Sequence, residues 1–155
     1  MIIYCAGPIK GDTTYQENYR EIIKIVDQAG HSALTELNGK FNSSIPLSDK
    51  QIYTRDIKWI EGSQLMIAEI SGPSLGVGFE IAYALFQKKI PVLALASVEV
   101  NKISAMITGC NSNLLTIVRY SNTDEMKNII GKYLKDFEKS SDNKGIHFSV
   151  FNKAL

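Results

Sequence analysis

Two carboxylates stand out because each lies in an apolar stretch of the sequence. Glu80 is the only charged residue in the segment 75–86, and a helix with apolar residues on all sides is expected to be largely buried. Asp56 lies among apolar residues on one face of a helix expected from about Asp49 to Glu61. Two carboxyl groups in different environments can divide the roles of ionised nucleophile and proton donor. The pair therefore points to nucleophilic and acid–base chemistry.

Both carboxylates also have structural interpretations. The helix dipole could stabilise Glu80, although a capping box is excluded because Val77, three residues earlier, is neither Ser nor Thr. Asp56 could pair with Arg55 or form a structural hydrogen bond at a helix end. We favour a functional Glu80, whereas both interpretations of Asp56 stay open.

The elements that must position these residues alternate along the chain. Strands are expected at Ile2–Ala6, Ser32–Thr35, Leu65–Ile70, Pro91–Leu95 and Leu115–Val118. Helical spacing separates several of them and recurs at residues 124–137. The alternation predicts an α/β fold, a Rossmann-like or flavodoxin-like doubly wound sheet of about five parallel strands with helices on both faces. Small-molecule sites in such sheets form at the carboxyl ends of the strands, where the glycine-rich turn before Glu80 is expected.

Length and composition suit a single domain with its own core. The chain has 155 residues, of which 45% are hydrophobic. We assign residues 1–138 to this domain and residues 139–155 to a C-terminal tail, which could be an edge strand, a subunit arm or disordered. A net charge of +1 with interspersed signs argues against binding to a nucleic acid polymer or an anionic membrane.

Targeting and metal-binding signals do not stand out in the sequence. No apolar run approaches the roughly 20 residues of a membrane span, and the first residues lack the basic region of a signal peptide, so we expect a cytoplasmic protein. The two cysteines and two histidines are scattered, which predicts neither a disulfide nor a metal site. No cofactor is expected.

Two further stretches could bind a ligand. The first follows the first strand and comprises Gly7, Pro8, Ile9, Lys10 and Gly11. Its glycines allow close approach of the backbone, and its lysine supplies a positive charge, but an ordinary turn is the alternative. The second stretch, residues 102–109, contains Ser104, which could simply cap a short helix.

Four segments together resemble a known family. They are Tyr4–Gly11, Arg55–Ile60, Ala68–Glu80 and Ser104–Ile107, and residues 73–80, Pro-Ser-Leu-Gly-Val-Gly-Phe-Glu, are the most specific block. In order and spacing over residues 2–120 they resemble the nucleoside 2-deoxyribosyltransferase superfamily, and within it the 2'-deoxynucleoside 5'-monophosphate N-hydrolase branch.

The resemblance implies an N-glycosidase acting on a small nucleotide. Glu80 would be the nucleophile that forms a glycosyl-enzyme, Asp56 the general acid acting on the base, and Tyr4 a hydroxyl beside the nucleophile. The implied substrate-binding residues are Gly7, Pro8, Ile9, Lys10, Gly11, Ser74, Gly76, Ser104 and Met106. Ser104 would reach the 5'-phosphate bound by the neighbouring subunit, which implies a homodimer.

The first loop departs from the family pattern. Pro8 and Lys10 stand where these hydrolases often carry Ser and Arg, which removes a hydroxyl donor and replaces a bidentate fork with a point charge. Ser74 and Ser104 still favour a monophosphate over a free nucleoside. The alternatives are a deoxyribosyltransferase that exchanges bases and a nucleotide-binding module without catalysis. The sequence does not distinguish among bases, or deoxyribose from ribose.

Overall fold

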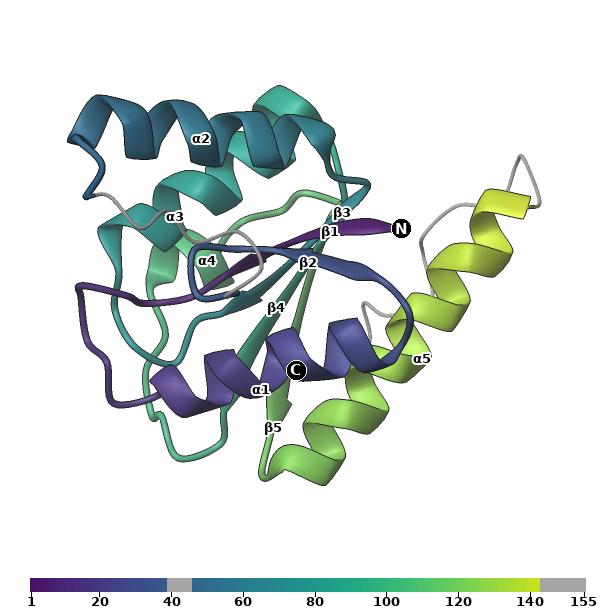
Figure 1. The fold of residues 1–155 in the computed structure, drawn as a ribbon. Coiled ribbons are helices and arrows are strands. Elements are labelled where there is room, and N and C mark those ends of the chain that lie inside the picture. Colours follow the sequence, from purple (N-terminus) through teal and green to yellow (C-terminus); the bar gives the residue numbers. More distant parts are fainter. Residues whose placement is uncertain (39–45, 143–155) are drawn as a thin grey trace.

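The described residues form one parallel sheet with the strand order β2-β1-β3-β4-β5 (Figure 1). The computed structural model describes residues 1–38 and 46–142. Its strands are β1 (Ile2–Ala6), β2 (Ser32–Leu34), β3 (Leu65–Glu69), β4 (Val92–Ser97) and β5 (Leu115–Tyr120). The strand order reverses between β1 and β3, and ligand sites of doubly wound sheets lie at this switch point. The expected α/β fold is confirmed.

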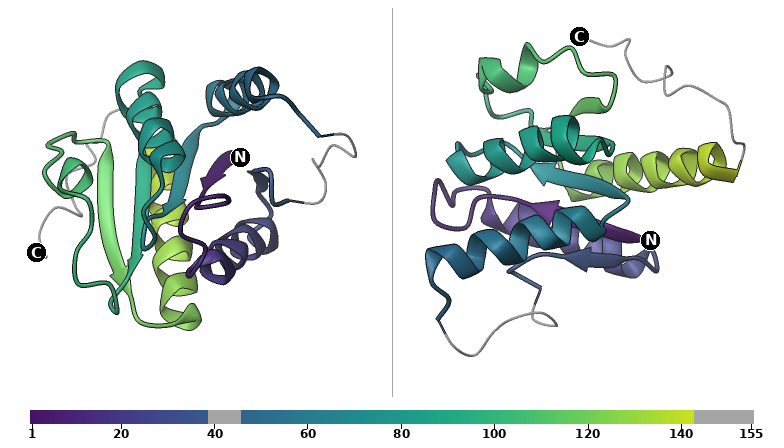
Figure 2. Two further views of the ribbon diagram at one scale, coloured as in Figure 1. Left: turned by 90° about the vertical axis from the view of Figure 1, so that its left-hand side faces the viewer. Right: turned by 90° about the horizontal axis from the view of Figure 1, so that it is seen from above.

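Helices cover both faces of the sheet (Figure 2). One face carries α1 (Gln16–Gln28) and α5 (Thr123–Asp142); the other carries α2 (Asp49–Gly62), α3 (Leu75–Ala82) and the π-helix η1 (Tyr83–Lys88). The single turn α4 (Ala105–Thr108) lies between β4 and β5. Among the described helices, none is long and apolar enough to span a membrane.

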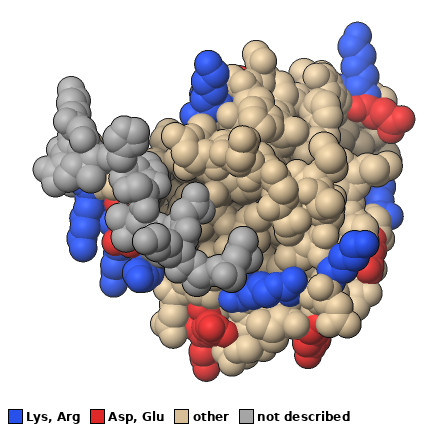
Figure 3. Space-filling model, turned by 180° about the vertical axis from the view of Figure 1, so that it is seen from behind, with Lys and Arg blue, Asp and Glu red and all other residues tan. Residues whose placement is uncertain are grey.

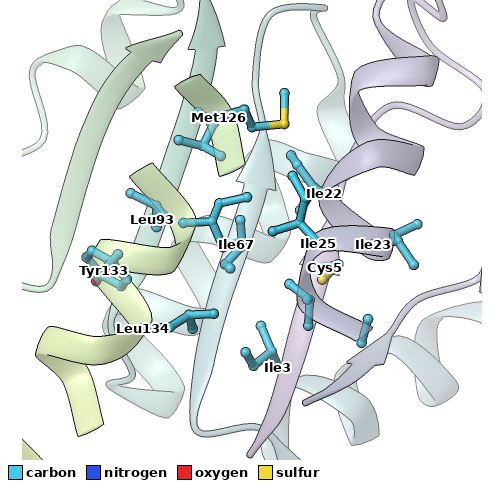
Figure 4. Close-up of a cluster of buried hydrophobic side chains, with 14 of the residues drawn as sticks. Ile3, Cys5, Ile22, Ile23, Ile25, Ile67, Leu93, Met126, Tyr133 and Leu134 are labelled. Atoms are coloured by element: carbon cyan, nitrogen blue, oxygen red, sulfur yellow. The ribbon is translucent and has the colours of Figure 1, made fainter. Parts of the chain in front are cut away.

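Alternating side chains of the central strands build two cores. Ile3 and Cys5 of β1 pack with Ile67 and Leu93 beneath α1 and α5 (Figure 4). Tyr4, between them in sequence, points to the opposite face and packs in the cluster beneath α2, α3 and η1. The pleat of β1 therefore directs Tyr4 towards the helix that contains Glu80.

The last helix is longer than its apolar spacing predicts. It continues to Asp142, so the predicted boundary after residue 138 falls inside α5. The hydroxyl groups of Ser140 and Ser141 donate to the carbonyls of Asp136 and Phe137 at 2.8 and 3.0 Å, within a polar segment that has no apolar stripe. The rest of the tail, 143–155, and positions 39–45 of the predicted surface loop lie outside the described residues.

The prediction that the Glu80 helix is largely buried is wrong. Val77, Ile81 and Leu85 face the sheet, but Leu75 is 97% exposed and Phe86 is 63% exposed. The helix packs on the sheet and, through Phe79 and Tyr83, beside α2, but no further layer of the described chain covers Leu75 and Phe86. The apolar residues of this helix therefore belong to two faces, one packed in the core and one exposed at the surface.

Candidate active site

The hydroxyl of Tyr4 donates a hydrogen bond to Oε1 of Glu80 at 2.8 Å. Tyr4 is the middle residue of β1 and is only 4% exposed, while Glu80 occupies the second turn of α3. Ser74 begins that helix, because its hydroxyl accepts the N–H of Val77 at 3.3 Å. A capped helix and a buried strand thus hold the two side chains together.

Burial controls the protonation of Glu80. It raises the pKa of the carboxyl from 4.5 to about 7, and the hydrogen bond from Tyr4 only partly opposes this effect. We expected the helix dipole to keep Glu80 ionised, but that influence is confined to the first turn and Glu80 is the sixth residue of α3. The expectation of a fully ionised Glu80 is therefore corrected, because desolvation is the largest influence on its pKa and favours the protonated form.

Asp56 lies in an ion-pair cluster at the site. Its Oδ1 accepts from Nε of Arg55 at 2.8 Å, and the second guanidinium contact is to Glu36 at 2.7 Å. The guanidinium also lies 4.7 Å from the ring centre of Trp59. Burial raises the pKa of Asp56, whereas Arg55 lowers it. The pair with Arg55, one of the two interpretations of Asp56, is therefore present in the structure.

Electrostatic interactions connect Asp56 to the Tyr4–Glu80 pair. The negative charge of Asp56 contributes to raising the pKa of both partners, although burial is the larger cause for each. Sequence reasoning missed Glu36, because a single acidic residue after a short strand carries no periodic or motif signal. Its contact with Arg55 arises only through the fold.

The first loop lies against the turn before α3. Gly7 sits over the ring of Tyr19, where an added Cβ would come within 2.3 Å, so only glycine fits. A Cβ on Gly11 would lie 2.9 Å from the carbonyl oxygen of Pro73 and 3.7 Å from Ser74. Pro8 is buried, Ile9 is half-buried, and Lys10 is exposed. The two predicted phosphate-binding loops are therefore neighbours.

Ser74 and Ser104 line the same hollow, whose volume is about 620 Å³. Met106 also lines it and is 84% exposed, while Gly76 is an exposed residue of the first turn of α3. Ser104 precedes α4, but its side chain makes no capping hydrogen bond within the described chain, so its hydroxyl is not committed to the helix. Tyr4, Asp56 and Glu80 lie outside this hollow.

Together, fold and site define an α/β enzyme with two carboxylates and two glycine-containing loops at the switch point of the sheet. The chain belongs to the nucleoside 2-deoxyribosyltransferase family, whose model matches residues 3–143.

Similar proteins include nucleotide N-hydrolases. A Thermofilum pendens protein provisionally named 2'-deoxynucleoside 5'-phosphate N-hydrolase 1 is 36% identical over 128 residues, covering 81% of this chain and 89% of that protein. The Danio rerio 5-hydroxymethyl-dUMP N-hydrolase is 31% identical over 145 residues, covering 90% of this chain and 100% of that protein.

Solved structures share the fold at lower identity. The Clostridium botulinum CMP N-glycosidase BcmB superposes with a TM-score of 0.59 at 17% identity, covering 84% of this chain and 98% of that one. A 2-deoxyribosyltransferase from Bacillus psychrosaccharolyticus superposes with a TM-score of 0.61 at 15% identity, covering 81% and 90%.

Proposed function

We propose that this protein is an N-glycosidase that hydrolyses 2'-deoxynucleoside 5'-monophosphates to free base and deoxyribose 5-phosphate. The observation that carries the proposal is the half-buried, desolvated Glu80 carboxylate, hydrogen-bonded to Tyr4 at the switch point of the sheet. The names of both similar proteins described above specify a phosphorylated deoxynucleoside as the molecule cleaved, and they support hydrolysis over base exchange.

The first chemical step breaks the bond between C1' and the base. Oxocarbenium character develops at C1', and ionised Glu80 forms a covalent bond to that carbon. Tyr4 binds Oε1 of Glu80, which leaves Oε2 to attack. A proton on Asp56 passes to the departing base, so the base leaves neutral. Arg55 binds Oδ1 of Asp56, which leaves Oδ2 to carry that proton.

The second step returns both carboxyl groups to their starting states. Asp56, now ionised, accepts a proton from water as the water oxygen bonds to C1'. The bond between C1' and Glu80 breaks, and its electron pair returns to the carboxylate. The products are the free base and deoxyribose 5-phosphate, and Asp56 is protonated again.

The 5'-phosphate would bind where the two loops meet. The N–H groups at the start of α3 and the hydroxyl of Ser74 offer donors at a helix N-terminus. Lys10 is exposed on the adjoining loop and can approach the same anion. Local donors of this kind suit a chain whose net charge is only +1.

The decisive experiment measures base release from each common deoxynucleoside and ribonucleoside, with and without its 5'-phosphate. Release restricted to monophosphates and abolished in Glu80→Gln supports the proposal. Glu61→Gln, at an exposed carboxylate, is the matched control and should retain full activity. Transfer to an added second base would instead identify the deoxyribosyltransferase, and saturable binding without turnover would identify a binding module.

We also propose that the protein acts as a homodimer through the hollow beside Ser104. Of the residues that line this hollow in the described chain, Lys102 alone is charged. Exposed Leu75, Phe86 and Met106 line it as well. Seen from behind, where α4 and β5 lie, the centre of the surface is poor in charge and charged side chains gather near its rim (Figures 2 and 3). A second copy of this chain would cover these apolar side chains.

Sedimentation tests the dimer, and subunit mixing tests whether its sites are shared. Phe86→Glu should convert dimer to monomer, whereas Phe137→Glu, at a half-buried position of α5 away from this hollow, should leave the dimer intact if it folds. Mixed dimers of Ser104→Ala and Glu80→Gln subunits should regain activity, because one of their two sites would be intact. A monomeric wild type, or no recovery in verified mixed dimers, would contradict the corresponding proposal.

A further inference from the structure

A second buried carboxylate, Glu69, has no part in the chemistry proposed above. It is the last residue of β3 and is 0% exposed. Its carboxylate accepts hydrogen bonds from the hydroxyl of Ser71, from the N–H of Ser71 at 3.1 Å, and from the hydroxyl of Tyr120 at 2.8 Å. A carboxylate with several donors at a strand end holds the following turn in one conformation.

The network around Glu69 joins the ends of three neighbouring strands. Ser97, the last residue of β4, donates its N–H to the hydroxyl oxygen of Ser71 at 2.7 Å. Tyr120 is the last residue of β5 and pairs with Ser97 in the sheet. Asn18 of α1 extends the network, because its Nδ2 donates to the hydroxyl oxygen of Tyr120 at 2.7 Å. The turn after β3 is therefore connected to α1.

The same turn of α1 also supports the first loop. Tyr19, the residue after Asn18, lies with its ring against Gly7 and donates its hydroxyl hydrogen to the carbonyl of Cys5 at 2.7 Å. Two consecutive residues of α1 thus support the two loops. Tyr19 contacts the first loop directly, and Asn18 is linked to the turn after β3 through Tyr120 and Glu69.

The two loops also touch each other with little spare room. A Cβ on Gly72 would lie 2.7 Å from the carbonyl oxygen of Asp12, and the N–H of Asp12 donates to the carbonyl of Pro73 at 3.4 Å. Ser74 directly follows Gly72 and Pro73, so a shift of the turn after β3 would change the position of Ser74 relative to the first loop. Since both loops contribute donors to the proposed phosphate site, their separation determines how well an anion fits between them.

We propose that Asn18, Tyr120 and Glu69 are positioning residues that set the separation of the two loops and thereby the affinity for the substrate's phosphate group. The inference rests on the proposed function, because it assumes that these loops bind a sugar phosphate. The three residues act through the loops and do not contact the substrate.

The test compares two single-hydroxyl deletions in buried tyrosines. Tyr120→Phe breaks the link between Asn18 and Glu69, whereas Tyr133→Phe removes the hydroxyl that bonds Thr116 in the α5 core. Calorimetric titration with 2-deoxyribose 5-phosphate measures phosphate affinity without requiring turnover. We expect Tyr120→Phe to raise the Kd about tenfold, because residues that orient a binding group without touching the ligand typically have an effect of this size. Tyr133→Phe should leave the Kd unchanged.

A kinetic comparison separates positioning from a general loss of structure. In Tyr120→Phe, KM for the monophosphate should rise with little change in kcat, whereas Tyr133→Phe should change neither constant. Asn18→Ala should shift the Kd in the same direction. Equal Kd values in Tyr120→Phe and wild type would overturn the positioning role of Asn18, Tyr120 and Glu69 but not the proposed function. If wild type itself bound no 2-deoxyribose 5-phosphate, both this positioning role and the proposed function would be refuted.

Discussion

The pH dependence of a Tyr4→Phe variant tests how Glu80, the proposed nucleophile, is ionised. Burial raises the pKa of Glu80 to about 7, and the hydroxyl of Tyr4 stabilises the charged form through a 2.8 Å hydrogen bond. In the proposed mechanism only ionised Glu80 attacks C1', so kcat/KM of wild type should fall below pH 7. At pH 6 about one tenth of Glu80 is ionised, and each further pH unit lowers this fraction about tenfold.

Removing the hydroxyl should move this acid limb to higher pH. A hydrogen bond to a charged group contributes about 1.5–3 kcal/mol, and one pKa unit corresponds to about 1.4 kcal/mol, so the pKa should rise by about one to two units. At the lower end of that range, the ionised fraction at pH 7 falls from about one half to about one tenth, and kcat/KM falls about fivefold. Above pH 9.5 this deficit should be almost absent.

The assay is the ratio of mutant to wild-type kcat/KM for base release, measured from pH 5 to 10. Taking the ratio removes the contribution of Asp56, provided that its titration is the same in both proteins. Tyr133→Phe, which deletes a buried hydroxyl elsewhere, should give a ratio near one at every pH. A Tyr4→Phe ratio that stays below one by the same factor at all pH values would show that Tyr4 does not control the ionisation of Glu80.

Three further predictions follow from the site. Folding raises the pKa of Glu80 from 4.5 to about 7, so wild type loses stability as the pH rises through this window. In urea unfolding, Glu80→Gln should therefore be more stable than wild type at pH 8, by up to about 3 kcal/mol, but not at pH 4. Arg55→Ala should raise the pKa of Asp56 and move the alkaline limb of kcat/KM to higher pH; an unmoved limb would argue against Asp56 as the acid. Gly7→Ala should lower the melting temperature sharply, whereas Gly131→Ala, at an open helix position, should raise it slightly; similar values for both would contradict the close packing of the first loop.

The parallel sheet and the meeting of Tyr4 with Glu80 follow closely from sequence patterns. Alternating elements predict a parallel sheet, and the carboxyl ends of its strands must share one edge. A tyrosine of the first strand and a glutamate of the helix after the third strand are brought together because these two strands are neighbours in the sheet. The family resemblance identified both residues, and the fold accounts for their contact.

The charge environment could not be predicted in the same way. The pKa of Glu80 depends on its depth below the surface and on its place within α3, and neither is encoded by the apolar spacing around it. The contact of Glu36 with Arg55 joins residues 19 positions apart across two elements. The exposed face of α3 was missed for a related reason, because composition does not distinguish a helix buried on all sides from one with an exposed apolar face.

At the proposed phosphate site, recognition of the anion would depend more on loop geometry than on charge. Pro8 is buried and has no N–H to donate, and Lys10 is an exposed point charge on a flexible stem. The remaining donors are backbone groups and serine hydroxyls, which bind an anion well only when held at the right separation. Three features constrain the loops in this way: the close contact of Gly7 with Tyr19, that of Gly72 with Asp12, and the hydrogen bonds of the buried Glu69 carboxylate. If the proposed function is correct, the loss of a hydroxyl and a guanidinium from the first loop makes the buried network that contains Glu69 more important for selecting a monophosphate.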